Sequence, residues 1–554
     1  MAIVDGLVVA LAGLLAAAFY APHVGFYSDD WVLLASFHLA PDQSIAGLYT
    51  STHAQHFASR PIQGLYSILL YKAFGLAPLG YQVVNALVLA ASAVLLRGVL
   101  ARLGASRLAA LGAGLVFACV PAFSTDRFWF AAFAAPLSVA LYLVSLRMDL
   151  ASARAEGASL VGWRAASLSV LAVGLLGYEL ALPLAFFSPG VARFQAWREG
   201  QTSWSWGRWA TWVLPTLALL VGLGIYKAED SGRLGSLDSE PKRIERILTG
   251  LLRSGAKDGD YGLNFPRAVA VNFGDHVLRL PSHAWALQGR VRTPALPVAV
   301  IVLALAAIGY LLRAARGERW AAGHWALMAA AGLGVFVLGY TIFLTNNAIQ
   351  ITPTGVGNRS SLAAAIGLAM VVAGVLGWLV SVLPLGAARA PVFATALTFY
   401  LSCGVFTTVA LASYWADAYS WEQVIIADIQ AHLKDPAPKS TIFLGGVCPY
   451  VGPAIVFESS WDLAFALRIA YHDPTVSADV VSRSFSAGRT AISTSLYDEE
   501  YDWPYGPATI LYDYRTKQVV PLVDQTTTLQ ALRRLGLPSP DCPPSKEGVG
   551  VSVF

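Results

Sequence analysis

Gly25-Phe26-Tyr27-Ser28-Asp29-Asp30-Trp31 follows directly on the first long apolar segment of the chain. Two adjacent carboxylates at the border of a membrane cost free energy unless they face water or take part in chemistry. Neighbouring carboxylates also raise one another's proton affinity, so one can act as a general base while the other binds or orients. An ordinary solvated turn, in which Ser28 or Asp30 caps a short helix, is the alternative. The stretch predicts a membrane border and a candidate pair of functional carboxylates.

The composition is typical of a polytopic α-helical membrane protein. Of the 554 residues, 56% are hydrophobic and 13% charged, and the mean hydropathy is +0.57, whereas a soluble domain carries about 25% charged residues. The apolar residues form long runs, which indicate helical spans rather than the alternating strands of a β-barrel. The net charge of +4 comes without a basic cluster interleaved with aromatics, so we expect no nucleic-acid partner. The sequence has no GxGxxG after a strand, no P-loop and no HExxH helix.

The apolar runs predict about eleven spans. They cover residues 7–22, 81–100, 108–123, 132–146, 165–177, 180–194, 209–226, 294–312, 325–344, 362–383 and 392–412. The short segment 61–75 suits a helix lying at the interface. The pair 165–177 and 180–194 leaves an alternative open, because each half is short for a bilayer of about 30 Å. One bent helix there would reverse the orientation of everything after it.

Arginines decide the orientation of the eleven-span arrangement. One side of the membrane receives Arg97, Arg102, Arg107, Arg147, Arg154, Arg164, Arg193, Arg198, Arg208, Arg313, Arg316, Arg319 and Arg389. The short loops of the other side hold only Arg60, Arg127 and Arg359. Basic residues collect on the cytoplasmic side. The N-terminus is therefore expected inside, on a retained first helix, with the Asp pair, the loops 23–80 and 227–292 and the C-terminal region outside a bacterial plasma membrane.

The composition changes after residue 412. Charge and proline content rise, and short β-like runs at 440–444, 490–493, 509–512 and 518–522 follow an amphipathic stretch at 421–433. We expect a membrane domain over 1–412 and an extracytoplasmic α+β domain over 413–554. Outside the cytoplasm a Cys448–Cys542 disulfide is plausible, whereas Cys119 and Cys403 lie in apolar runs as core residues.

Four features in order resemble the GT-C superfamily of polyprenyl-phosphate-sugar-dependent membrane glycosyltransferases, including its protein mannosyltransferase and aminoarabinose transferase branches. They are the Asp pair after the first span, a loop ending Arg60-Pro61, an interfacial helix, and the helix start Tyr81-Gln-Val-Val-Asn85. The resemblance covers roughly residues 1–200 and the stretch around Arg359. It implies that Asp29 or Asp30 deprotonates an acceptor hydroxyl, and it leaves the choice between them open.

Two sites at the outer rim are candidates for binding the phosphate of a lipid donor. Arg60 offers a forked pair of donors at headgroup depth, although an interfacial arginine also reaches for water without further function. Asn358-Arg359-Ser360-Ser361 opens a span from the outside, where an arginine runs against the usual charge bias. Beside a helix N-terminus, Asn358 and Arg359 would make an anion site. The family resemblance implies the same role for a late outer arginine.

Further polar residues are candidates for an acceptor site or a supporting role. Asp126 matches the acidic residue that the resemblance implies in the second outer loop, and a local ion pair with Arg127 is its alternative. Tyr178-Glu179 lies between two apolar segments, and a glutamate at membrane depth is a functional candidate that could hold an acceptor or a metal.

A divalent metal stays open as a cofactor. His53 and His56, spaced HxxH, could meet a metal alongside the Asp pair, although surface histidines near headgroups are common.

The expected function is transfer of a sugar from a polyprenyl-phosphate donor, such as an undecaprenyl phosphate, to a hydroxyl on a glycan, lipid or protein at the outer membrane face. The first alternative is an oligosaccharyl- or polymer-forming transferase with a pyrophosphate-linked donor, which would predict a bound metal. The second is a sugar or lipid transporter (flippase). A transporter should carry charges at mid-membrane, whereas here they gather at one rim. A non-catalytic membrane anchor is the third.

Overall fold

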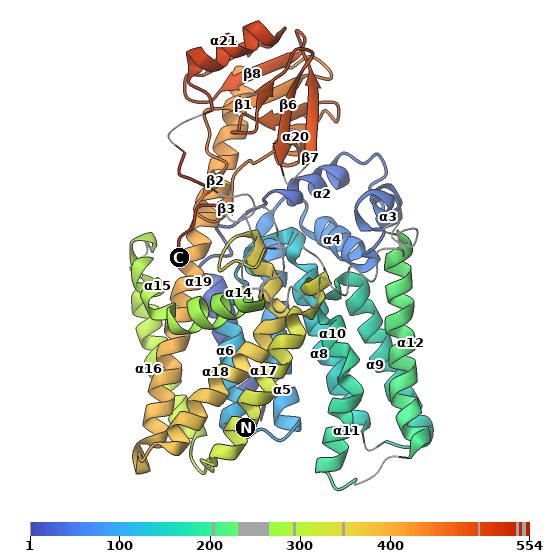
Figure 1. Cartoon of the computed structure of the whole chain (residues 1–554), viewed down its shortest axis with the longest axis vertical. Coiled ribbons are helices and arrows are strands. Elements are labelled where there is room, and N and C mark those ends of the chain that lie inside the picture. Colours follow the sequence, from blue (N-terminus) through green and yellow to red (C-terminus); the bar gives the residue numbers. More distant parts are fainter. Residues whose placement is uncertain are drawn as a thin grey trace.

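The computed structural model describes residues 2–153, 155–201, 205–230, 265–291, 295–345, 350–496, 499–538, 542–545 and 550–554. Figure 1 shows a bundle of long helices with a strand-containing domain above one end. The N-terminus lies at the opposite end of the bundle. The predicted fold class, a polytopic helical membrane protein with a C-terminal α+β domain, is confirmed.

The described residues include eight helices long and apolar enough to cross a membrane. They are α5 (Pro78–Arg102), α8 (Ala134–Ser152), α9 (Gly157–Gly177), α12 (Trp206–Asp230), α16 (Ala295–Ala314), α17 (Ala322–Thr341), α18 (Leu362–Val382) and α19 (Arg389–His432). Two shorter apolar helices join them, α1 (Ala2–Ala18) and α6 (Arg107–Cys119). Each corresponds to one predicted span.

The uncertain pair at 165–194 forms two passes, not one bent helix. Helix α9 is followed by η4 (Glu179–Ala181), α10 (Leu182–Phe186) and α11 (Ser188–Arg198), and α11 lies beneath α10 in Figure 1. A proline stands at the start of both α10 and α11. Because proline lacks an N–H and fixes φ, it breaks this returning segment into two pieces. The count of eleven segments, from which the orientation was predicted, is therefore unchanged.

Glycines bring α17 and α18 into close contact. A Cβ atom on Gly332 would lie 2.7 Å from Cβ of Met370, and one on Gly367 would lie 2.2 Å from N of Phe336. Gly339 and Gly374 approach the partner backbone in the same way, at Ala364 and Ala329. Small residues at an interface let membrane helices associate through backbone packing. The pair forms a rigid support for the loop that carries Arg359.

Short helices cap the end of the bundle next to the C-terminal domain. They are α2 (Asp29–His38), α3 (Ile45–Thr52), η1 (His53–Phe57) and α4 (Pro61–Phe74), with η2 (Pro121–Phe123), α7 (Thr125–Phe128), η3 (Phe130–Ala132), η8 (Ile342–Thr345) and η9 (Val356–Ser361) between spans. The predicted interfacial helix at 61–75 is α4. Of the predicted outer loop 227–292, the structure describes α14 (Phe265–Val269), η6 (Ala270–Leu278), α15 (Leu280–Ala286) and η7 (Gln288–Arg290), and residues 231–264 lie outside the described part.

Helix α19 runs without interruption from the bundle into the C-terminal domain. It has 44 residues, and at about 1.5 Å per residue it is roughly twice as long as a bilayer core is thick. The predicted division at residues 412 and 413 falls inside this helix. The two domains are therefore joined by a rigid rod rather than by a linker.

The C-terminal domain is built on a four-stranded sheet in the order β4-β1-β8-β9. Strand β1 is parallel to β4 and β8, and β8 is antiparallel to β9. The strands are β1 (Thr441–Gly445), β2 (Tyr450–Val451), β3 (Ala454–Ile455), β4 (Ser477–Val480), β5 (Ser486–Ala487), β6 (Ala491–Leu496), β7 (Glu499–Pro504), β8 (Thr509–Asp513) and β9 (Gln518–Pro521). Helices α20 (Ser460–Tyr471) and α21 (Gln525–Leu535) complete it, and a disulfide joins Cys448 to Cys542.

One hydrophobic core continues from the outer cap of the bundle into this domain. It includes Phe37 of α2, Ile68 of α4, Ile425 of α19 and Leu467 of α20, all fully buried. Burial of apolar area is the main force that holds packed elements together. The C-terminal domain and the cap around the Asp pair thus form one packed unit.

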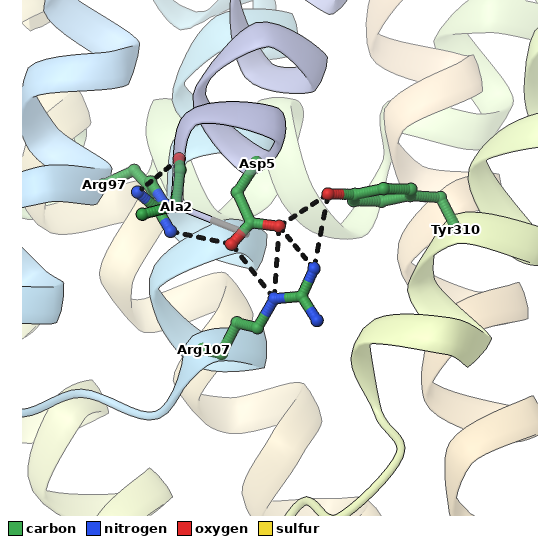
Figure 2. A network of polar contacts seen from close by, with 5 residues as sticks. All are labelled: Ala2, Asp5, Arg97, Arg107 and Tyr310. Carbon is green, nitrogen blue, oxygen red and sulfur yellow. Dashed lines mark hydrogen bonds and ion pairs between the residues drawn. The ribbon is translucent and has the colours of Figure 1, made fainter.

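An ion network closes the opposite end of the bundle (Figure 2). Asp5 of α1 accepts from Arg97 of α5 at 2.7 Å and from Arg107 at 2.6 Å. The hydroxyl of Tyr310 in α16 also donates to Asp5. A buried carboxylate with two guanidinium partners ties four helices together at the end far from the C-terminal domain.

Candidate active site

The Asp pair begins α2 at a strained turn. Ser28 precedes the helix with φ 47° and ψ −118°, a conformation that residues other than glycine seldom adopt. Asp29 and Asp30 are the first two residues of α2 and belong to its first turn. The backbone N–H groups there favour negative charge. The turn therefore presents two carboxylates in different directions.

Asp30 is a structural residue of this turn. Its carboxylate is fully buried and accepts from the backbone N–H of Tyr27 at 2.9 Å and of Ala131 at 2.7 Å. Burial raises the pKa of Asp30 well above its usual range, although these backbone hydrogen bonds oppose the shift. With both oxygens occupied, Asp30 ties the turn to the loop before α8.

Asp29 differs from Asp30 in its exposure. Its side chain is exposed, and among the described residues it accepts no hydrogen bond. Although solvent reaches it, the surrounding protein raises the pKa of Asp29 above its usual value, and Arg359 opposes that shift. An accessible carboxylate with a raised pKa is suited to accept a proton near neutral pH. The structure thus distinguishes two residues that the sequence left equivalent.

Arg359 lies over an aromatic ring beside Asp29. Its guanidinium carbon is 5.0 Å from the centre of the Trp129 ring, whose own N–H donates to the carbonyl of Tyr27. The Arg359 side chain is half-buried, and within the described chain it has no hydrogen bond or ion pair. A guanidinium stacked on an indole keeps its donors free for a planar or tetrahedral anion. Site residue Trp129 was not predicted from the sequence.

Asn358 has a structural position, and its predicted role in phosphate binding stays a prediction. Its amide oxygen accepts from the Ser124 hydroxyl and the Thr125 N–H, and its amide nitrogen donates to the carbonyls of Ala122 and Pro353. These four bonds use the full capacity of the amide. Asn358 therefore fixes η9, and with it Arg359, against the loop before α7.

Asp126 is buried beside Arg359. Neither of its carboxyl oxygens has a hydrogen-bond partner in the described part of the chain. Burial raises the pKa of Asp126 well above its usual range, although Arg359 and Arg127 oppose the shift. Asp126 and Arg127, both among the described residues, do not form the local ion pair considered as the alternative. Arg127 donates instead to the carbonyls of Ala118 and Val120. Asp126 is placed to act on Arg359 rather than on a ligand in solvent.

Arg60 is engaged by Glu179. Its Nε and Nη2 atoms donate to the two carboxylate oxygens at 3.1 and 2.5 Å, and its guanidinium lies 4.1 Å from the Tyr178 ring centre. Lys227 at the end of α12 donates to the same carboxylate at 2.7 Å. Burial alone would raise the pKa of Glu179, but its two cationic partners lower it to about 2. The structure brings Tyr178 and Glu179 to Arg60 and adds Lys227, a partner not predicted for this site.

The chain links this cationic cluster to the Asp turn. Gln63, one helical turn after Arg60 on α4, donates to the carbonyl of Ala131 at 3.2 Å. The N–H of Ala131 in turn donates to Asp30. The cluster formed by Arg60, Glu179 and Lys227 therefore borders the same loop that positions Asp29.

The metal site suggested for the two histidines is not assembled. His53 stacks on Tyr49 with ring centres 4.9 Å apart, and Nε2 of His56 lies 3.4 Å from the Ser36 hydroxyl. The residues that the structure describes contain no group of three or more His, Cys, Asp or Glu side chains able to hold a metal ion. Carboxylate and imidazole groups must converge to bind a divalent ion tightly.

A scan against protein-family models and a search of curated proteins found no match. Among solved structures, the chain is similar to ArnT from Cupriavidus metallidurans in the apo state, with 16% identity over 87% of both chains and a TM-score of 0.42. The same protein bound to undecaprenyl phosphate gives 16% identity over 86% of both chains and a TM-score of 0.41. An Archaeoglobus fulgidus oligosaccharyltransferase in complex with Zn and sulfate gives 14% identity over 84% of this chain and 61% of that chain, with a TM-score of 0.38.

Proposed function

We propose that this protein is a membrane glycosyltransferase that moves a sugar from a polyprenyl-phosphate donor to a hydroxyl acceptor at the outer membrane face. One observation carries the proposal: an accessible carboxylate, Asp29, lies close enough to the guanidinium of Arg359 to interact with it electrostatically, and neither has a hydrogen-bond partner among the described residues. A base and an anion site held side by side are the two elements that transfer from a phosphate leaving group requires.

Each residue has one task in this reaction. Asp29 accepts the proton of the acceptor hydroxyl as its oxygen attacks the anomeric carbon of the sugar. The bond between that carbon and the phosphate oxygen breaks, and the lipid phosphate leaves with an added negative charge. Arg359 stabilises this charge, and Trp129 holds the guanidinium in place. The resemblance to the GT-C superfamily implies a single displacement that inverts the anomeric carbon.

The position of the site fits the supply of such a donor. Asp29 and Arg359 lie on the cap elements α2 and η9, at the end of the bundle next to the C-terminal domain (Figure 1). The arginine-rich loops belong to the other end, which the positive-inside rule assigns to the cytoplasm. A site outside has no nucleotide-sugar supply, so a donor carried by the membrane is required.

The cationic cluster of Arg60, Glu179 and Lys227 has an accessory role in the proposal. It carries two positive charges and one negative charge, so a net positive charge remains at the rim. A positive field at the mouth of a site raises the local concentration of an anionic ligand. Arg60 thus contributes to the approach of the lipid phosphate, and Arg359 to its departure.

Native mass spectrometry of the purified protein with added undecaprenyl phosphate tests the proposal. The parent and Asp29→Ala are expected to retain the lipid phosphate, and Arg359→Ala is expected to lose it. Arg279→Ala is the matched control, because Arg279 is an exposed arginine of the same outer region with a partner of its own, Asp275. No bound lipid in the parent, or equal retention by both arginine variants, would contradict the proposal.

A further inference from the structure

The turn before Asp29 is strained and needs support from outside itself. Ser28 has a positive φ of 47°, and an L side chain there persists only when its surroundings hold it. Within the turn, the N–H of Asp30 donates to the carbonyl of Tyr27 and that of Trp31 to the carbonyl of Ser28. These local bonds define the shape of the turn, but they do not reach the side chain of Ser28.

The support for this side chain comes from the C-terminal domain. The indole N–H of Trp461, the second residue of α20, donates to the Ser28 hydroxyl at 3.2 Å, across 433 residues of sequence. From the outer half of α19, Glu422 accepts from the indole N–H of Trp31 at 3.3 Å. Both bonds attach residues that flank Asp29 to elements outside the cap.

Trp461 is itself held in place. Helix α20 begins with a capping box, in which Ser459 accepts from the first turn and Asp462 accepts from the N–H groups of Glu458 and Ser459. This arrangement fixes the N-terminus of a helix. Helix α20 also packs along α2, within the core that the cap and the C-terminal domain share. Trp461 is therefore a rigid donor rather than a mobile surface side chain.

We propose that Trp461 is a positioning residue for transfer: through its bond to Ser28, the C-terminal domain holds the turn that aims Asp29 at the acceptor. This inference rests on the proposed function and assigns a role to the domain. Trp461 acts through Ser28 and takes no proton. A base must be held within fractions of an ångström of its productive position, and a loosened support lowers the rate without changing which groups bind substrate.

Three substitutions test the bond from both sides. Trp461→Phe keeps an aromatic ring, although a smaller one, and removes the donor, and Ser28→Ala removes the acceptor while keeping the strained φ. Each is expected to lower kcat about three- to tenfold with KM unchanged, the range expected for one neutral hydrogen bond. The double variant is expected to be no slower than the slower single variant, because both remove the same contact. Ser28→Gly is expected to lose less than Ser28→Ala, because glycine adopts φ 47° without strain.

Trp503→Phe is the matched control. The Trp503 indole N–H donates to the Thr494 hydroxyl at 3.1 Å, a bond of the same kind in the same domain but between β6 and β7. This variant is expected to keep the parent kcat. Loss of activity in Trp503→Phe equal to that in Trp461→Phe would overturn the inference, because it would indicate a general effect of domain stability.

Hydrogen exchange of the amides at residues 27–31 gives a readout that needs no activity. Trp461→Phe and Ser28→Ala are expected to speed this exchange several-fold, and Trp503→Phe to leave it unchanged. Faster exchange in a protein whose parent shows no transfer would support the positioning role and count against the proposed function alone. Unchanged exchange and unchanged kcat in both variants, with an active parent, would overturn the positioning role alone.

Discussion

Two aspartates at opposite ends of the bundle show how the same side chain serves different purposes. Asp5 is buried and bound by Arg97, Arg107 and Tyr310 (Figure 2). Asp29 is exposed and, in the described part of the chain, has no hydrogen bond, although Arg359 acts on it electrostatically. A carboxylate that is hydrogen-bonded by its cationic partners holds helices together. A carboxylate that only feels a nearby cation, without a hydrogen bond to it, is available for chemistry.

The comparison predicts first that Asp29 and Asp30 differ in function. Asp29→Asn is expected to lower transfer about 10²- to 10⁴-fold, the usual contribution of a general base, with an unchanged or slightly raised melting temperature. Asp30→Asn is expected to lower the melting temperature, because its oxygens accept two backbone bonds. Initial rates and thermal melting of both variants measure this. An active Asp29→Asn variant would remove Asp29 from the mechanism.

Asp5→Ala is expected to act on stability alone. Removing this carboxylate leaves two guanidinium groups without it at the helix ends far from the C-terminal domain, and breaking a buried pair costs about 3–5 kcal/mol. We expect a clearly lower melting temperature in detergent and a parent-like kcat in the folded fraction. Asp275→Ala, which removes the partner of the largely exposed Arg279, is the control and should change melting little. Lost transfer in a well-folded Asp5→Ala protein would contradict the division of roles.

The pH dependence of transfer sharpens the pairing of Asp29 with Arg359. Desolvation raises the pKa of Asp29 and Arg359 lowers it, with a net rise. A base works only when deprotonated, so kcat/KM should fall as the pH drops through this raised pKa, and the acid limb should lie above the usual carboxylate range. Arg359→Met removes the opposing charge and is expected to move the limb to higher pH, besides lowering the rate. If the acid limb of the pH–rate profile were identical in the parent and in Arg359→Met, Arg359 would not act on the pKa of the catalytic base.

Glu179→Gln tests an intermediate case, a carboxylate matched by two cations at the rim. Because Arg60 and Lys227 lower the pKa of Glu179 to about 2, its stabilising contribution is present above the unfolded carboxylate pKa and is lost as the pH falls toward 2. Glu179→Gln is expected to cost about 1–2 kcal/mol of stability at neutral pH, with partial exposure reducing the effect. The difference in melting temperature between the parent and Glu179→Gln should be full at pH 7 and should disappear only as the pH falls toward about 2.

Asp126→Asn is expected to have the smallest effect. Burial raises the pKa of Asp126 well above its usual range, which favours the neutral carboxyl, and an amide of the same shape replaces a neutral carboxyl with little change. Transfer rates within about threefold of the parent are expected. The charged form of Asp126 is disfavoured, so losing it should change the rate little. A loss comparable to that of Asp29→Asn would show that Asp126 works as an anion.

Much of the scaffold was predictable because membrane helices can be identified from the local sequence. Apolar runs of sufficient length identify spans, since no backbone polar group can stay unpaired in lipid, and the segment 61–75 was recognised as α4 by its short length. The strands β1, β6, β8 and β9 were found from their apolar residues. Strand β4 was missed because it carries a buried polar residue, Asp479, which accepts from Thr494.

The sequence by itself determined that two carboxylates and a late arginine stand at the ends of apolar segments, because the cost of charge in lipid leaves such residues few places. Only the tertiary structure decided what each of them does. Asp30, Asn358 and Arg60 are occupied by Ala131, Ser124 and Glu179, which lie between 101 and 234 residues away in the chain. Hydrogen-bond partners are set by packing in space and not by sequence separation. Asp29 and Arg359 became the candidate site because packing gives hydrogen-bond partners to Asp30, Asn358 and Arg60, whereas the described residues give none to these two.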